Sequence, residues 1–148
     1  MEIASVISDL GDVQYLHAKP VIEGYLNHPE AWVRRNAIQA LTIDFKAQEH
    51  RTTCEIMIRD ETDFDARNVA ISGLGQLLRF APGLTGIKIL AALVRNPNEE
   101  IVHREAAYQG ILWIKGVDPR EHPWFKEGFV EEIVDWNMIS RIEAGLPP

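Results

Sequence analysis

The chain has only one cysteine, Cys54, among its 148 residues, so no internal disulfide can form. A lone thiol is typical of proteins from a reducing compartment, and we expect the cytoplasm. No apolar run approaches the roughly 18 residues of a membrane-spanning helix. The N-terminal segment lacks a basic region and carries Glu2, Asp9 and Asp12, unlike a signal peptide. The sequence therefore predicts no membrane partner.

Clusters of basic side chains are also missing. Lys and Arg total 15 against 22 Asp and Glu, which gives a net charge of -7, and no local group is stronger than Arg34–Arg35. Nucleic-acid binding needs several cations that follow the phosphate backbone, so nucleic acid is not an expected partner. An acidic surface favours solubility or a basic partner.

The alternation of apolar and polar residues that marks β-strands is nearly absent, while helix-forming residues are abundant. The length fits one domain with an ordinary core. We therefore expect a single all-α domain that spans residues 1–148.

Three segments of the chain resemble one another: VRRNAIQAL at 33–41, ARNVAISGL at 66–74 and HREAAYQGI at 103–111. Their offsets of 33 and 37 residues lie in the range of helical repeats. After each arginine, small and large residues recur at i, i+3 and i+4, which places them on one helix face. The aligned positions are Arg34, Arg67 and Arg104; Ala37, Ala70 and Ala107; Ala40, Gly73 and Gly110; and Leu41, Leu74 and Ile111. Glycine inside a helix costs about 1 kcal/mol relative to alanine, so Gly73 and Gly110 predict close helix contact.

A shorter apolar segment precedes each of these helices, and Pro29, the acidic stretch 60–65 and Pro97 separate the two. The pattern predicts three helical hairpins at about 19–46, 47–80 and 83–116, followed by a C-terminal cap at 117–148. Thr85 is the expected N-cap of its helix. The predicted terminal elements are an N-terminal helix with Ile3, Val6, Ile7 and Leu10 on one face, and a last helix at about 129–143 with Phe129, Ile133, Trp136 and Ser140 on one face.

The stretches PEAWVRRNAIQAL, DFDARNVAISGL and EEIVHREAAYQGI resemble short HEAT-like repeats of the bacterial and archaeal type, such as those of phycobilin-lyase-like proteins. The resemblance implies a right-handed α–α superhelix. It also implies that Arg34, Arg67 and Arg104 form a ladder with acids of the turns. Because such families include scaffolds, lyase subunits, hydroxylases and a DNA glycosylase, the resemblance does not specify a function.

Two pairs of residues have helical spacing that would suit a metal: His50 with Cys54, and Glu99 with His103. Zinc normally takes three or four protein ligands, and no second cysteine exists. His103 is followed by Arg104, so the His-Glu pairs of the HEAT-like hydroxylases are not matched either. We therefore expect no catalytic residue, no metal and no cofactor.

The remaining candidates for function lie on the surface. Opposite the apolar face, polar residues form a stripe that would line the concave side of a helical array. We expect this stripe to bind a protein or peptide, as a scaffold module or as an immunity protein that neutralises a basic partner. The alternatives are an enzyme or lyase-like subunit with a small ligand in the groove, and a homodimer formed by the exposed ends. The stripe consists of Arg35, Gln39, Thr42 and Lys46, then Asn68, Ser72, Gly75 and Arg79, then Glu105, Gln109 and Leu112, and the exposed aromatic anchors would be Trp32 and Trp124.

Overall fold

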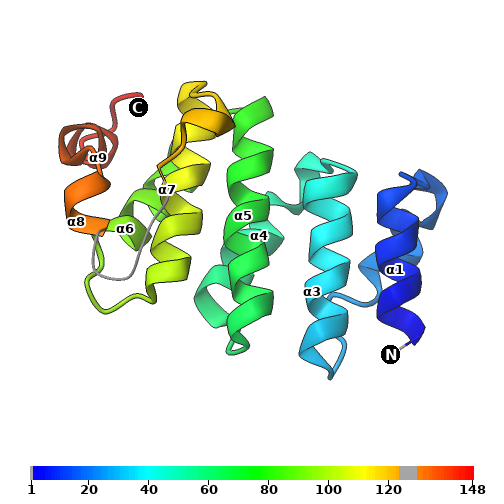
Figure 1. Ribbon diagram of the computed structural model, residues 1–148. Coiled ribbons are helices and arrows are strands. Elements are labelled where there is room, and N and C mark those ends of the chain that lie inside the picture. The colour runs from blue at the N-terminus through cyan, green and yellow to red at the C-terminus, as the bar shows by residue number, and fades with distance from the viewer. Residues whose placement is uncertain (1, 124–129) are drawn as a thin grey trace.

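The computed structural model describes residues 2–123 and 130–148, and within these ranges it contains helices and no strand (Figure 1). This confirms the all-α prediction. The long helix α3 ends in a π-helical turn, η2, and three short 3-10 turns join other helices. The elements are α1 (Glu2–Asp12), η1 (Leu16–Ala18), α2 (Lys19–Glu23), α3 (Ala31–Gln39), η2 (Ala40–Asp44), η3 (Gln48–His50), α4 (Arg51–Asp60), α5 (Phe64–Phe80), α6 (Leu84–Arg95), α7 (Ile101–Lys115), η4 (Pro119–Glu121), α8 (Val130–Ile133) and α9 (Trp136–Glu143).

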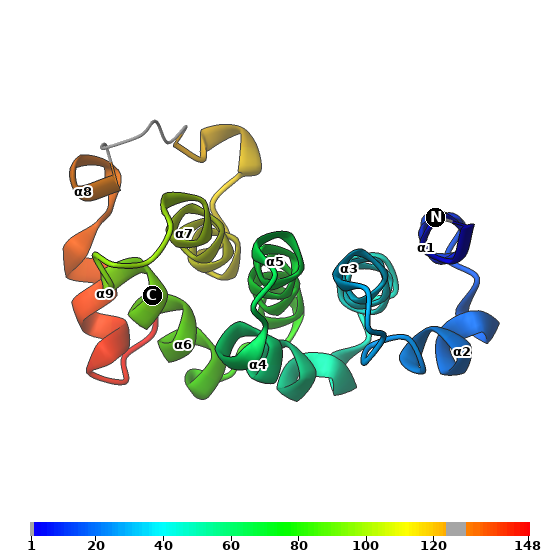
Figure 2. The ribbon, with the colours of Figure 1, turned by 90° about the horizontal axis from the view of Figure 1, so that it is seen from below.

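The helices form two layers (Figure 2). One layer consists of α1, α3, α5 and α7 side by side, and the other contains α2, α4 and α6. In the first layer α5 packs against α3 on one side and α7 on the other. At the C-terminal end α9 packs against α6. The first layer follows a shallow arc (Figure 2). One side of α3, α5 and α7 faces away from the second layer.

The repeated apolar positions occupy the core, as predicted. The second and fourth aligned columns of the repeat are completely buried, because they face the second layer and the neighbouring helices. The side chains concerned are Ala37, Ala70 and Ala107, and Leu41, Leu74 and Ile111.

Glycines allow the helices of the first layer to approach closely. A Cβ atom on Gly75 would lie 2.7 Å from the Cα atom of Gly110, too short for any real contact. A Cβ atom on Gly73 would overlap with the side chain of Thr42. The predicted role of Gly73 and Gly110 in close contact is therefore confirmed, and Gly75 shares it.

Two positions at the boundaries of helices differ from the prediction. The N-cap of α6 is Gly83, and Thr85 lies inside the helix. The expected helix at 129–143 is interrupted between α8 and α9, since the Asp135 carboxylate accepts a hydrogen bond from the backbone N–H of Met138 and starts a new helix. The buried face of α9 is Met138, Ile139 and Ile142. Trp136 is half-buried and packs against the same core, as expected, whereas Ser140 is exposed. Phe129 lies outside the described residues.

The core is divided into two clusters of buried side chains. The smaller one belongs to the N-terminal end, where Ile7 of α1, Ile22 of α2 and Val33 of α3 meet. The larger one is centred on α5 and includes Leu74, together with residues of α4, α6, α7 and α9. Of the apolar face expected on α1, Ile7 is buried, whereas Ile3 and Val6 are 43% and 53% exposed.

Candidate functional site

The three repeated arginines join neighbouring hairpins by ion pairs. In each pair the guanidinium group lies on a helix of the first layer, and the glutamate follows about 30 residues later in the chain. This is the ladder that the resemblance implied. The pairs are Arg34 with Glu61, Arg67 with Glu99, and Arg104 with Glu131.

The pair in the middle of the chain shows why these arginines are structural. Arg67 donates through Nη2 to Glu99 at 2.8 Å and through Nε to the carbonyl of Ile58, also at 2.8 Å. The hydrogen bond from Arg67 lowers the pKa of Glu99 to about 2. His103 completes the group, because its Nδ1 lies 2.9 Å from Glu99 and its Nε2 lies 3.1 Å from the carbonyl of Phe64. Both ring nitrogens of His103 are thus engaged in hydrogen bonds within the protein.

By helical period, the polar residues predicted to bind a partner share one side of each of α3, α5 and α7, away from the buried columns. Arg35 is exposed, and the other members are half-buried. We call this surface the inner face. It consists of Arg35, Gln39, Asn68, Ser72, Glu105 and Gln109.

Five residues of the predicted stripe do not belong to the inner face. Lys46 follows the end of η2, Arg79 lies in the last turn of α5, and the other three are buried. Thr42 is completely buried, and its hydroxyl donates to the carbonyl of Ile38 at 2.7 Å. Leu112 is 7% exposed. Gly75 is buried at the contact between α5 and α7. The helical period alone could not reveal the buried positions, because neighbouring helices cover part of the face opposite the core.

Two side-chain oxygens on α5 have no hydrogen-bond partner although they are buried. They are Oδ1 of Asn68 and Oε1 of Gln76. In a helix, residues 68, 72 and 76 lie one turn apart along one side, so these oxygens flank Ser72 at the centre of the inner face. A buried acceptor without a donor costs about 1–3 kcal/mol. Because neighbouring atoms cover both oxygens, an outside donor can reach them only when the amide side chains turn towards the surface.

Glu105 adds an acidic group to the same surface. Its carboxylate accepts a hydrogen bond from Gln109 at 3.2 Å, and burial raises the pKa of Glu105.

A cavity of about 260 Å³ lies beside Gln109, where the rings of Trp113 and His122 are 6.0 Å apart. The lining residues are Gln109, Trp113, Pro119, His122 and Pro123.

Of the two predicted aromatic anchors, Trp32 lies in the first turn of α3 and, contrary to expectation, is not exposed. It is half-buried against the N-terminal cluster, and its indole N–H donates to the carboxylate of Glu30. Trp124 lies outside the described residues.

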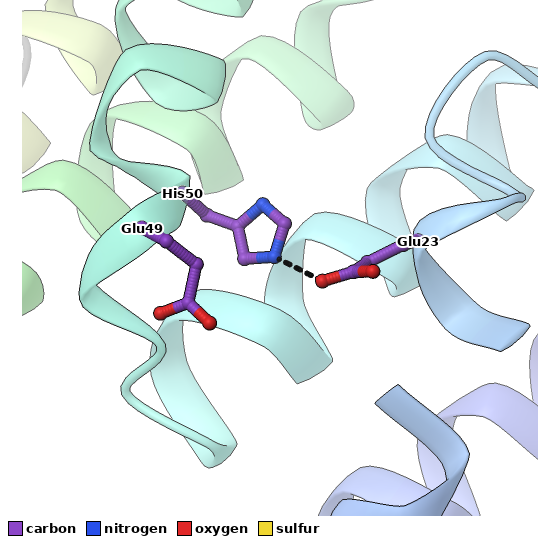
Figure 3. A group of neighbouring side chains, drawn as sticks. All are labelled: Glu23, Glu49 and His50. Atoms are coloured by element: carbon purple, nitrogen blue, oxygen red, sulfur yellow. Dashed lines mark hydrogen bonds and ion pairs between the residues drawn. The ribbon is translucent and has the colours of Figure 1, made fainter. Parts of the chain in front are cut away.

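Glu23, Glu49 and His50 come together between two hairpins (Figure 3). Glu23 is the last residue of α2, whereas Glu49 and His50 belong to η3. One donor atom from each lies within 4.8 Å of the other two, and His50 Nε2 is 3.0 Å from Glu23 Oε1. Within residues 2–123 and 130–148, this is the group whose donor atoms could hold a metal ion.

The cysteine that the spacing had paired with His50 does not take part in this group. Cys54 is fully buried, and burial raises the pKa of its thiol to about 12, so the thiolate is not available as a ligand. The sequence reasoning missed Glu23 because it precedes His50 by 27 residues, and no local spacing connects them. Only the packing of α2 against the following turn brings them together.

In the described part of the chain, no helix is both long enough and apolar enough to span a bilayer. Comparisons of the chain with protein-family models, with curated proteins and with solved structures gave no match.

Proposed function

We propose that the chain is a HEAT-like α-solenoid that binds a protein or peptide on its inner face and has no catalytic role. In this proposal the hairpins at 19–46, 47–80 and 83–116 stack as a right-handed superhelix between terminal caps. The aligned columns of buried residues and the arginine ladder support the repeat architecture. Stacked second helices of such arrays commonly form a binding surface.

The observation that carries the binding proposal is the pair of unpaired oxygens on α5. Asn68 Oδ1 and Gln76 Oε1 are separated by two helical turns, about 12 Å along the helix axis. An extended peptide offers backbone N–H donors along its length, which could satisfy both oxygens once the half-buried amide side chains turn towards it. A partner that supplies these donors would recover the cost of the two buried acceptors.

The charge of the chain favours a basic partner. Its net charge of -7 attracts cations over the whole surface, and Glu105 places one carboxylate on the inner face itself. A protein that neutralises a basic toxin domain is one specific form of this proposal. Its binding would weaken as salt screens the attraction.

A phage library of random peptides tests the proposal. We expect peptides selected on the parent chain to lose binding to Ser72→Arg, because a long cationic side chain would cover the space between Asn68 and Gln76. The matched control is Thr52→Arg, which adds the same charge to an exposed position of α4. Peptides should bind this control as they bind the parent chain.

Two results would argue against the proposal. Peptides that bind Ser72→Arg as well as the parent chain would place the binding surface elsewhere. Selection that yields no peptide above background would mean that the inner face does not recognise extended chains.

The cavity beside Gln109 supports a second candidate function, in which a small ligand binds in the groove as in a lyase-like or enzymatic subunit. Its volume of about 260 Å³ and the facing rings of Trp113 and His122 suit a flat aromatic molecule. Gln109→Arg would abolish such binding, whereas Ser72→Arg would leave it unchanged. A ligand screen by tryptophan fluorescence, repeated on both variants, separates this function from peptide binding.

A further inference from the structure

We propose that Glu23, Glu49 and His50 form a binding site for a divalent transition-metal ion, and that zinc is the ion the donor set fits best. This proposal departs from the absence of a metal site expected from the sequence. It concerns the junction between the first two hairpins and is independent of the inner face.

The geometry of the three donors is close to that of a zinc site. Zinc–nitrogen and zinc–oxygen bonds are about 2.1 Å long, so two ligands of a tetrahedral ion are about 3.4 Å apart. His50 Nε2 and Glu23 Oε1 are already 3.0 Å apart, and all three donors lie within 4.8 Å of one another. Since the side chain of Glu49 is 54% exposed, it can rotate to complete the site without disturbing the core. Water would take the fourth position.

His50 is oriented for this role by its other ring nitrogen. The residue is only 8% exposed, and its Nδ1 lies 3.4 Å from the hydroxyl of Thr53. In the metal-free chain Nε2–H donates to Glu23. A metal would displace this proton, and with Nδ1–H then donating to Thr53, Nε2 would offer its lone pair to the ion. Metal-binding histidines usually have such a second hydrogen bond, which fixes the tautomer and the ring orientation.

The protein already places a cation at this position. The ammonium group of Lys19 forms an ion pair with Glu49, so two carboxylates and an imidazole share one positive charge. A zinc ion would displace Lys19 and supply two charges at the same place. Lys19 therefore acts as an internal competitor for the metal, and its removal should strengthen metal binding.

The donor types select the class of ion. Imidazole nitrogen with carboxylate oxygen suits zinc and neighbouring transition metals, whereas magnesium and calcium prefer sites made of oxygen alone. A bound ion would link α2, which belongs to the N-terminal cluster, to η3, which precedes α4. The site would thus fasten the first hairpin to the second.

Isothermal titration of the full chain with zinc chloride, in a buffer without chelating groups, tests the site. We expect one equivalent to bind with a micromolar Kd. His50→Gln and Glu49→Gln should each weaken binding at least tenfold. The matched controls are His17→Gln and Glu55→Gln, which remove a histidine and a glutamate outside the site and should leave the Kd unchanged.

Lys19→Met gives the sharpest test, because only a site shared by Lys19 and the metal predicts tighter binding in this variant. At a hundredfold excess over Kd, zinc should also raise the thermal midpoint of the parent chain by about 5–10 °C, and magnesium should not. Circular dichroism checks that each variant folds. If His50→Gln does not fold, Glu49→Gln still tests the site, because Glu49 is exposed.

The proposal is overturned if no saturable binding occurs, or if Glu49→Gln binds zinc as tightly as the parent chain. A Kd that does not change in Lys19→Met would also overturn it, since zinc would then occupy a different place.

Discussion

At the scale of single residues, Arg67 connects three separate elements of the fold. It contacts a helix-terminal carbonyl, a glutamate and a histidine, and these belong to three different helices or turns. The side chain of Glu99 is only 9% exposed, so its charge depends on Arg67 for compensation. The contribution of this pair to stability is therefore best measured by removing the arginine.

Arg67→Met should lower the free energy of unfolding by about 2–4 kcal/mol, because it leaves the buried Glu99 without its guanidinium partner and with only His103 beside it. Urea denaturation measures this loss. The control is Arg59→Met, whose ion pair with Asp60 is exposed at both ends and should contribute less than about 1 kcal/mol. Equal losses in the two variants would contradict the structural role of the ladder.

The pKa of Glu99 predicts how stability depends on pH. Its pKa is lowered to about 2 in the folded chain from an ordinary 4.5, so the unfolded chain binds a proton first as the pH falls. The stabilisation is fully present above pH 4.5 and is lost as the pH falls from there towards 2. Urea denaturation between pH 7 and pH 3 should show a shallower acid dependence in Glu99→Gln than in the parent chain. An identical dependence would mean that this carboxylate does not govern acid stability.

At the scale of helices, the contact between α5 and α7 reverses a common rule. Replacing glycine by alanine inside a helix normally stabilises it by about 1 kcal/mol. At Gly75 the added methyl group would meet the backbone of Gly110, which cannot move aside without separating the helices. Whether Gly75→Ala stabilises or destabilises the chain therefore reports how closely α5 and α7 approach each other.

Gly75→Ala should destabilise the chain by about 1–3 kcal/mol in spite of the gain in helix propensity. Ser72→Ala, one turn earlier on the half-buried inner face of the same helix, should be neutral or slightly stabilising. Thermal denaturation of both variants checks the difference. A more stable Gly75→Ala would show that α5 and α7 lie further apart.

The helices also show how far the sequence could predict this fold. The repeated columns at Ala37, Leu41 and their counterparts were predictable, because helical periodicity reports burial directly. The role of Gly75 was not, since the period does not tell which flank of a helix a neighbour covers. The break between α8 and α9 was missed because the Asp135 cap competes with an apolar pattern that continues across it, whereas the predicted end at 143 is confirmed.

The two candidate sites also differ in how far the sequence could predict them. The inner face was largely predictable from the face opposite the buried columns, and Arg35, Asn68 and Glu105 indeed lie on it. The group of Glu23, Glu49 and His50 had no local signal. Its members come from different hairpins, so only the stacking of these hairpins brings them together.

At the scale of the whole molecule, the divided core predicts uneven stability. The N-terminal cluster is small, and α1 stands at the end of the first layer, where it packs against α3 and η2 on one side only. The cluster around α5 contains most of the large buried side chains. A smaller buried core gives a lower free energy of local opening.

Hydrogen exchange followed by mass spectrometry should show faster exchange in α1 and α2 than in α5 and α7. The difference should appear under native conditions, where local opening dominates. Equal protection of α1 and α5 would mean that the two clusters open as one unit.

The arginine ladder has one direction along the chain. Each arginine reaches the glutamate that follows it, from α3 to the turn before α5, from α5 to the turn before α7, and from α7 to α8. A duplicated segment 62–99 would therefore bring its own arginine and its own glutamate, and no charge would remain unpaired. Such a chain can lengthen by duplication inside its gene without a redesign of its core, so its number of hairpins is free to follow the size of whatever it binds.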